Sequence, residues 1–329
     1  MATLAPLLQR FFTDRLMTQK HASSHTIASY RDAWRLLLGY AQQKTGTPPW
    51  KLQIGQLDTE LITAFLQHLE QDRGNSERTR NARLAAIHSL FRYAALHAPE
   101  DAHTIQQVLA IDGSRITTGP ICWLTNTESK ALLAVPDRTT RIGRRDYAML
   151  LILLRAGLRV SELTSLTRAD VQLGPGAHIR SLGKGRKARS TPLDPATAAV
   201  LNEWLTETGG RPTDPLFPNR HGQPLSRDTV AARISKYRKT AAAACPTLLG
   251  KTISPHTLRH SNAMALHQAG VDIAVLALWL GHSSTKSTDI YIHADIESKE
   301  QALAHTAPPD VTPGRYKPPD PLLAFLESL

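Results

Sequence analysis

Apolar side chains recur at three- and four-residue spacing through residues 1–110, the pattern of helices that bury one face. Ser23 or Ser24 is placed to cap the first such stretch, Asp58 the second and Ser76 the third, because these side chains accept hydrogen bonds from free N–H groups at a helix start. We therefore expect a helical domain over residues 1–110. The apolar positions of the three stretches are Ile27, Tyr30, Trp34, Leu37 and Leu38, then Leu61, Ile62, Phe65, Leu66 and Leu69, then Leu84, Ile87, Leu90, Phe91 and Ala94.

The pattern changes after residues 111–120, which have the composition of a linker. Thr125 and Glu128 form a capping-box sequence, and an apolar helix then runs to Gly157. Residues 174–193 alternate around a glycine-framed turn, which predicts short antiparallel strands, and helices resume after residue 195 with a hairpin or loop at 215–224. We expect a mainly α, two-domain protein whose α-rich second domain, residues 121–305, holds a small antiparallel β-sheet. Residues 306–329 read as a proline-rich spacer followed by a short helix at 322–329.

The sign and the distribution of charge indicate a class of binding partner. The 329-residue chain has 39 Lys and Arg against 28 Asp and Glu, a formal net charge of +11. Residues 111–190 hold 14 basic and 6 acidic side chains, whereas residues 191–329 hold 13 of each. This excess favours a polyanionic partner, nucleic acid before an anionic membrane surface.

Several other classes of protein are disfavoured. Cys122 and Cys245 are the only cysteines, too few for a disulfide framework or a cysteine-rich zinc site. The first residues do not have the pattern of a secretion signal, and the most apolar run, residues 147–158, is interrupted by Arg155 and too short to span a bilayer. We expect a cytoplasmic protein with reduced cysteines and no membrane segment.

A histidine- and arginine-bearing helix start is the first candidate for chemistry. Ser254 is a good N-cap, and His256, Arg259 and His260 share one face of the helix that follows. A helix start with a histidine and an arginine suits a bound phosphate. Two alternatives stay open: a zinc site, although Thr257 stands where the zincin pattern has its general-base glutamate, or a hydrogen-bonded pair of interfacial histidines.

Two further segments add positive charge. Arg159 and Glu162 begin another helix on one face, where a surface ion pair is the simpler interpretation. Lys184 lies between two glycines at the predicted hairpin tip, where it can reach a ligand or belong to a flexible basic loop. His282 and Tyr291 carry little information by themselves.

Taken in order, these segments resemble the tyrosine recombinase (phage integrase) family, in its Xer-like branch. The resemblance covers roughly residues 120–305, and the preceding helical segment looks like the family's core-binding domain. It implies that Arg159, Lys184, His256, Arg259 and His282 are catalytic, that Tyr291 is the nucleophile, and that Glu162 and His260 support them. The motifs are GLRVSEL at 157–163, GKGRK at 183–187, HTLRH at 256–260, LGHSS at 280–284 and YIH at 291–293.

The resemblance also implies a reaction. Arg159 and Arg259 would hold the scissile phosphate of double-stranded DNA, Lys184 would protonate the departing 5′ oxygen, and His282 would donate a hydrogen bond to the phosphate. His256 would move protons at the tyrosine side. The product would be a 3′-phosphotyrosyl bond, formed without metal, other cofactor or ATP.

Strand exchange would then pass through a Holliday junction in a homotetramer, or a tetramer with a related recombinase, on two DNA sites. The helix at 322–329 would dock onto its own domain or onto a neighbouring subunit. This chemistry serves integration, excision or resolution of DNA elements, including mobile ones. The alternatives are a type IB topoisomerase that swivels strands and a non-catalytic architectural DNA-binding factor.

Basic residues outside the catalytic set are expected either to contact DNA or to form a solvated face. They are Arg78, Arg80 and Arg83 in the first domain, and Arg180, Arg186, Lys187 and Arg189 around the hairpin.

Overall fold

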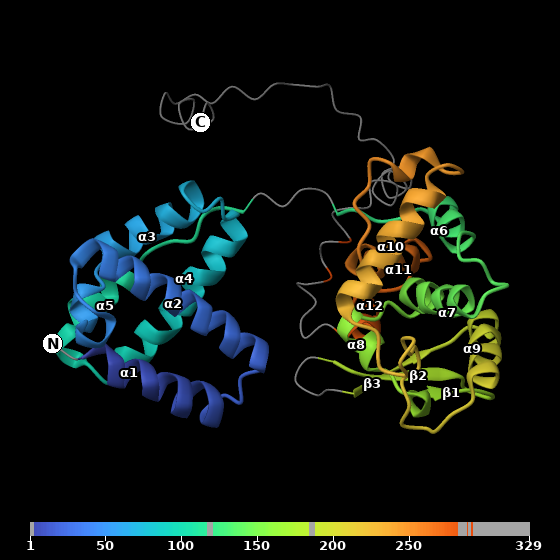
Figure 1. Cartoon of the computed structure of the whole chain (residues 1–329), viewed down its shortest axis with the longest axis horizontal. Helices are drawn as coiled ribbons and strands as arrows, with labels where there is room; N and C mark the ends of the chain where they lie inside the picture. Colours follow the sequence, from blue (N-terminus) through green and yellow to red (C-terminus); the bar gives the residue numbers. More distant parts are fainter. Residues whose placement is uncertain (1–2, 117–120, 184–187, 282–287, 289–290, 292–329) are drawn as a thin grey trace, which may run out of the picture. The chain divides into compact units, whose positions relative to one another are not determined.

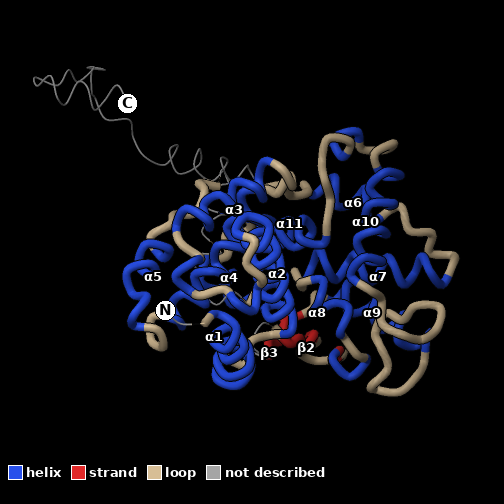
Figure 2. Tube along the Cα trace, turned by 60° about the vertical axis from the view of Figure 1, so that its left-hand side comes forward, coloured by secondary structure: helices blue, strands red, loops and turns tan. Residues whose placement is uncertain are grey.

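The computed structural model describes residues 3–116, 121–183 and 188–281, together with residues 288 and 291. The chain divides into two compact units, Met1–Gly119 and Pro120–Leu329, each with its own apolar core (Figure 1). Figure 2 shows that helices make up most of the described chain and that the strands are confined to one small region. The expected mainly helical, two-domain fold with a small antiparallel sheet is confirmed.

The first unit is helical, and its three predicted caps are present. The side chains of Ser23, Asp58 and Ser76 accept hydrogen bonds from backbone N–H groups three residues on. Trp34 and Phe65 lie fully buried in the core between the helices so begun. The elements are α1 (Leu4–Arg10), a π-helical segment (Phe11–Gln19), α2 (Ser24–Thr45), α3 (Thr59–Gln71), α4 (Glu77–Ala94), α5 (Ala102–Leu109) and 3₁₀ turns at Pro49–Lys51, Ile54–Gln56 and Pro99–Asp101.

Residues 111–116 follow α5 and keep contacts with the first unit. Ile111 packs against its core, and Ser114 exchanges backbone hydrogen bonds with the Asn81 side chain of α4 at 2.8 and 2.9 Å. This part of the segment assigned to a linker is therefore fastened to the first unit. Residues 117–120 lie outside the described residues.

The second unit is built around α7 (Arg141–Ala156), whose last three turns are almost entirely buried. Helices α9 and α11 pack on it. Thr125 and Glu128 form the predicted capping box. Gly157 ends α7 in a left-handed conformation, which glycine adopts without strain. The other helical elements are α6 (Asn126–Leu133), α8 (Val160–Ser165), α9 (Pro195–Thr208), α10 (Arg227–Ala241), α11 (Pro255–Gln268), α12 (Ile273–Leu280) and 3₁₀ turns at Arg168–Asp170 and Pro246–Leu248.

A three-stranded antiparallel sheet lies at one end of this unit (Figure 1). Its order is β1 (Val171–Gln172), β2 (His178–Leu182) and β3 (Ala188–Pro192). Ile179 of β2 pairs with Thr191 of β3, and both side chains are buried on the face toward the core. Strand β1 is too short to show any periodicity in the sequence, whereas the hairpin of β2 and β3 is confirmed.

No helix within the described part of the chain is long and apolar enough to cross a bilayer. The expected helix at 322–329 lies outside the described residues.

Candidate active site

The N-terminus of α11 forms as its sequence predicts. The Ser254 hydroxyl accepts a hydrogen bond from the Thr257 N–H at 3.2 Å, and Pro255 occupies the first turn. This start fixes the side chains that follow: Arg259 is buried, whereas His256 is exposed and His260 is half-buried. These three residues, predicted to share a face, therefore meet different surroundings.

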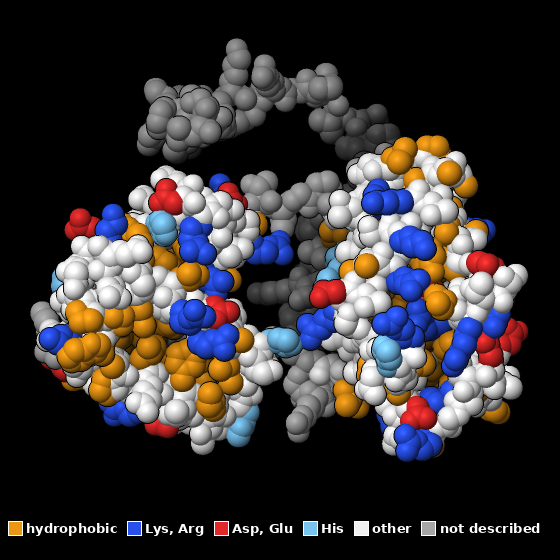
Figure 3. Space-filling model, viewed as in Figure 1, with side chains coloured by type: hydrophobic (Ala, Val, Ile, Leu, Met, Phe, Trp, Pro, Cys, Tyr) orange, Lys and Arg blue, Asp and Glu red, His pale blue; other side chains and the backbone are white. Residues whose placement is uncertain are grey.

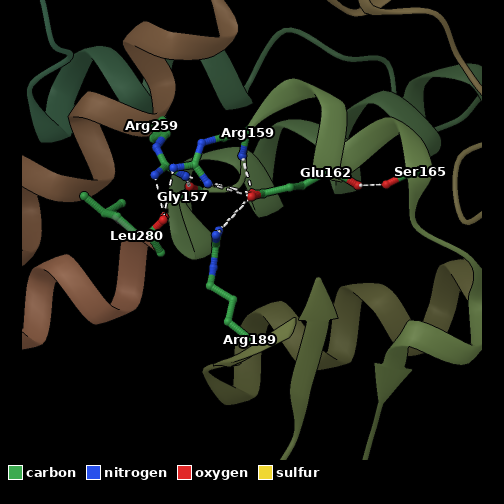
Figure 4. Close-up of polar contacts among 8 residues, drawn as sticks. Gly157, Arg159, Glu162, Ser165, Arg189, Arg259 and Leu280 are labelled. Carbon is green, nitrogen blue, oxygen red and sulfur yellow. Dashed lines mark hydrogen bonds and ion pairs between the residues drawn. The ribbon is translucent and has the colours of Figure 1, made fainter. Parts of the chain in front are cut away.

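Three arginines from three elements converge on Glu162 of α8 (Figure 4). Arg159 donates to Glu162 from its backbone N–H and from Nη1, each at 2.8 Å. Arg189 of β3 makes two hydrogen bonds to the same carboxylate at 3.0 and 2.9 Å, and Arg259 lies 4.0 Å from it. Three guanidinium groups share one carboxylate, so the cluster keeps an excess of positive charge. Such a cluster suits an anion.

Glu162 is deeply buried, with 2% of its side chain exposed. Burial by itself would raise its pKa, but the Arg159 N–H and the charge of Arg189 outweigh burial, so the pKa of Glu162 is lowered from its ordinary value. The carboxylate is therefore ionised at neutral pH. It serves as the common counter-ion of the cluster.

Arg259 is only 3% exposed and is held by backbone carbonyls. Its guanidinium donates to the carbonyl oxygen of Gly157 at 2.6 Å and to that of Leu280 at 2.5 Å, the ends of α7 and α12 (Figure 4). Burial, then the charges of Arg159 and Arg189, lower its pKa to about 10, so it stays cationic at neutral pH. Arg259 is thus fixed in place before any ligand binds.

Asn262 fastens α11 to the end of α7. Its side-chain amide donates to the carbonyl oxygens of Leu154 and Arg155 at 3.0 and 2.9 Å. A Cβ added to Gly157 would lie 2.5 Å from the Asn262 side-chain oxygen, so this close approach requires glycine as well as the left-handed backbone. The carbonyl that binds Arg259 is positioned by this contact.

Arg189 has a different setting from the one its place near the hairpin suggested. Instead of an open DNA-facing side chain, it is 11% exposed and committed to Glu162. The signal was available: Arg189 and Thr191 are two residues apart in a strand and share its inward face, where an arginine needs a carboxylate. A Cβ on Gly281 would lie 2.5 Å from an Arg189 nitrogen, so Gly281 makes room for it.

Tyr291 lies in an apolar cluster beside the arginines. It is 1% exposed and packs with Ala263, Met264, Leu276 and Leu280. Its hydroxyl is 2.8 Å from Nδ1 of His260. Burial raises the pKa of Tyr291 to about 12, although the charge of Arg259 acts in the opposite direction. The hydroxyl is therefore neutral at pH 7.

The two histidines of α11 both have a lowered pKa. For His256, which is exposed on one side, the causes are partial burial, then the charges of Arg259 and Arg159. For His260 they are burial, then His256 and Arg259. Each is therefore neutral at pH 7. Of the two, His260 contacts Tyr291, although sequence reasoning gave it only a supporting role.

The described geometry gives little support to a zinc site at these histidines. The ring centroids of His256 and His260 are 6.5 Å apart, and Nδ1 of His260 is occupied by the Tyr291 hydroxyl. No group of three or more metal-ligating side chains occurs among the residues that the structure describes.

Four of the predicted residues, Lys184, Arg186, Lys187 and His282, lie outside the described residues.

The predicted DNA-contacting arginines of the first unit differ in exposure. Arg78 is exposed, whereas Arg83 is half-buried and donates to the Ser29 carbonyl at 3.1 Å. Arg80 is largely buried, 3.5 Å from Glu70. Arg78 is therefore the most available of the three. In the second unit, Arg180 is exposed and 3.7 Å from Asp170.

Basic side chains also gather on the face of the second unit that carries α10 (Figure 3). Arg227, Lys236 and Lys239 of this helix are exposed. A cavity of about 630 Å³ at its N-terminal end is lined by four arginines, namely Arg141, Arg145, Arg220 and Arg233. The summed charge of residues 191–329 is zero, because acidic residues elsewhere in that segment balance the basic residues of α10. The sum therefore gave no sign of this basic face.

The site therefore combines an arginine cluster that suits an anion with a buried tyrosine on a helical scaffold, the combination that the tyrosine recombinase resemblance implies. Comparisons with known proteins agree. The model of the phage integrase family matches residues 122–298, and the model of the phage integrase N-terminal SAM-like domain matches residues 8–97.

Two relatives span nearly the whole chain. The protein y4rC of Sinorhizobium fredii, named as an integrase/recombinase, is 51% identical over 100% of this chain and 99% of its own length. Tyrosine recombinase XerD of Pseudomonas putida is 33% identical over 92% of this chain and 97% of its own. The chain belongs to the phage integrase family, the tyrosine recombinases, which are DNA strand-transferring enzymes that work without a metal ion.

A solved structure shows the same fold. The XerH site-specific recombinase, bound to its difH substrate in a post-cleavage complex, superimposes with a TM-score of 0.70 at 24% identity, over 87% of this chain and 81% of that one. Membership of the family makes site-specific DNA recombination the activity of this protein, and it does not favour a topoisomerase or an architectural factor.

Proposed function

We propose that Tyr291 is the nucleophile of this recombinase and forms a 3′-phosphotyrosyl bond with DNA. The phenolic oxygen bonds to phosphorus, the bond from phosphorus to the 5′ oxygen breaks, and that oxygen leaves as a 5′-hydroxyl after taking up a proton. The 5′-hydroxyl of another strand reverses these steps. The phosphodiester energy is kept in the covalent bond, so rejoining needs no ATP.

One observation supports this proposal above the others: the excess of positive charge around Glu162 lies beside the buried hydroxyl of Tyr291. Arg259 belongs to both surroundings, because its charge acts on the pKa of Tyr291 and it is an ion-pair neighbour of Glu162. A pentacoordinate phosphate gains negative charge in the transition state, and fixed guanidinium groups stabilise that charge. Arg159 and Arg259 are the pair we assign to the non-bridging oxygens.

The remaining roles follow from the motifs. Lys184 is the acid for the leaving 5′ oxygen, and His282 donates a hydrogen bond to the phosphate. His256 is exposed beside Arg159 and Arg259, which supports a place at the phosphate. Glu162 holds the arginines, and Arg189 shares that carboxylate.

The exchange reaction requires more than one subunit. We propose a tetramer of this chain, or of this chain with a related recombinase, on two double-stranded DNA sites in the cytoplasm, with a Holliday junction between the two strand exchanges. The basic face of α10 and Arg78 are available for DNA phosphates beyond the site of cleavage. Integration, excision or resolution of a mobile DNA element is the process we propose.

A nicked suicide duplex tests the nucleophile. When the cleaved strand loses its short 5′-hydroxyl fragment by diffusion, the covalent protein–DNA adduct accumulates and is counted on a denaturing gel. The wild-type chain should form the adduct with and without a chelator, and Tyr291→Phe should form none. Tyr147→Phe, a change of the same kind in α7, is the matched control and should keep the adduct.

The outcome that overturns the assignment is an adduct with Tyr291→Phe, or none with the wild-type chain on its own recombination site. A two-site plasmid separates exchange from swivelling: recombination yields rearranged products, whereas a topoisomerase only removes supercoils. The site itself can be found by footprinting DNA that flanks the gene.

A further inference from the structure

Among the residues that the structure describes, the hydroxyl of the proposed nucleophile contacts His260, which is not the histidine that the family motif assigns to the tyrosine side. Nδ1 of His260 lies 2.8 Å from the Tyr291 hydroxyl. The rest of the Tyr291 side chain packs against the apolar residues Ala263, Met264 and Leu276. A ring nitrogen is therefore already in hydrogen-bond contact with the hydroxyl that must lose its proton.

The direction of this hydrogen bond depends on the tautomer of His260. Tyr291 is neutral at pH 7 because burial raises its pKa to about 12, so its O–H can donate. His260 is also neutral, because burial and the neighbouring charges of His256 and Arg259 lower its pKa. A neutral imidazole has one nitrogen without hydrogen, and the tautomer with its hydrogen on Nε2 accepts this hydrogen bond at Nδ1.

We propose that His260 accepts the proton of the Tyr291 hydroxyl during strand cleavage and returns it during rejoining. This inference rests on the proposed function and sharpens it. As the phenolic O–H bond breaks, an N–H bond forms at Nδ1, and the phenolic oxygen bonds to phosphorus while the 5′ oxygen leaves with a proton from a separate acid. In rejoining, the attacking 5′-hydroxyl returns its proton to the separate acid and its oxygen bonds to phosphorus. The phosphorus–tyrosine bond breaks, and the phenolic oxygen takes back the proton from the His260 imidazolium.

The residues around His260 favour only a short-lived imidazolium. An imidazolium at His260 lies near two further groups on the same helix, His256 and Arg259, and the positive charge of Arg259 disfavours it. The charge of the same arginine acts against the effect of burial on the pKa of Tyr291 and so favours a phenolate. The proton is therefore readily returned once the strand has been exchanged, as a reversible reaction requires.

His256 is in a different position. Its ring centroid is 6.5 Å from that of His260, its side chain is exposed, and the charges that act on it are those of Arg259 and Arg159. These neighbours place His256 with the phosphate-binding arginines. The two histidines, one turn apart, thus divide between the two halves of the site.

Single-turnover cleavage of the nicked suicide duplex by the full-length chain tests this role. His260→Asn offers an acceptor but cannot take a proton, and it should slow adduct formation by about a hundredfold or more, the usual contribution of a general base. His260→Ala should be as slow and should recover partly with added imidazole. His267→Asn, in the last turn of α11, is the control and should cleave at the wild-type rate.

The pH profile separates proton transfer from support of the fold. Wild-type cleavage should fall as the pH drops through the lowered pKa of His260, because the imidazolium cannot accept, and His260→Asn should lack that inflection. Nitrogen-15 NMR of the histidines should show an unprotonated Nδ1 on His260 in the folded wild-type protein, a readout that needs no activity.

Three results would overturn the role: a wild-type rate for His260→Asn, an unchanged pH inflection in that variant, or a hydrogen on Nδ1. Each leaves the proposed function intact, provided that the wild-type chain still forms an adduct and Tyr291→Phe does not. Loss of the wild-type adduct would instead reject the proposed function.

Discussion

The arginine cluster and the surroundings of Tyr291 are the two halves of the site, and different interactions stabilise them. The half that we assign to the phosphate, called the phosphate half, is a network of charges, in which Arg159, Arg189 and Arg259 surround the buried carboxylate of Glu162. The tyrosine half is apolar, and among the described residues it is a hydrogen bond to His260 that holds the hydroxyl of Tyr291. The phosphate half is expensive to disturb because buried charges depend on one another, whereas the tyrosine half can lose its reactive group with little damage to the fold.

The largest effect should follow from Glu162→Gln, which removes the shared counter-ion. Three guanidinium groups would be left without their carboxylate, and breaking such a buried ion pair costs about 3–5 kcal/mol of the free energy of unfolding. Calorimetry of the full chain should show a lower melting temperature for the second unit, with adduct formation lost as well. A loss under about 1 kcal/mol would show that the network does not stabilise the fold.

Acid should remove the same contribution from the wild-type protein. The pKa of Glu162 is lower in the folded state than its ordinary value, so its contribution to stability is complete above that ordinary value and disappears as the pH falls through the folded pKa. Melting temperatures measured between about pH 2 and pH 7 should therefore fall more steeply for the wild type than for Glu162→Gln. Parallel curves would contradict this prediction.

Gly281→Ala should have an intermediate effect, because it introduces two separate problems. Residue 281 has a φ of +63°, which costs a non-glycine residue about 1–2 kcal/mol, and the new Cβ would also displace the Arg189 side chain from Glu162. Gly270→Ala is the matched control, since its φ is +82° and nothing lies within 4 Å of its added Cβ. The excess loss of stability over this control measures the contact with Arg189; equal losses would mean that Arg189 moves freely.

The smallest effect on stability should come from Tyr291→Phe. The ring keeps its apolar neighbours, and one hydrogen bond to His260 is lost, so the free energy of unfolding should fall by about 1 kcal/mol or less. Calorimetry measures this loss of stability, and the suicide duplex measures the loss of adduct. A variant that loses the adduct but keeps its stability would distinguish the tyrosine half most clearly from the phosphate half. A drop as large as that of Glu162→Gln would remove the distinction.

Local features of this site could be predicted from the sequence, whereas long-range contacts could not. The caps at Ser254 and Thr125, the end of α7 at Gly157 and the hairpin each depend on a few adjacent residues. The arginine pair and Glu162 were identified through their motifs. Arg189 was expected among the DNA contacts because its partner lies 27 residues away and depends on the register of the hairpin.

The partner of Tyr291 was equally beyond local reasoning. The His260 contact spans 31 residues and depends on how the apolar cluster closes around the tyrosine. The basic face of α10 was missed for another reason: a sum over a long segment cancels charges that the fold separates in space.

The groups that bind Arg259 determine how much of its positive charge remains to attract DNA. A carboxylate that held this guanidinium directly would cancel its charge, but carbonyl oxygens at the ends of α7 and α12 carry only partial negative charge. These two helix ends hold the arginine by two of its N–H groups and neutralise little of its charge. Much of the positive charge of Arg259 is therefore left inside the protein for the phosphate that we propose binds there.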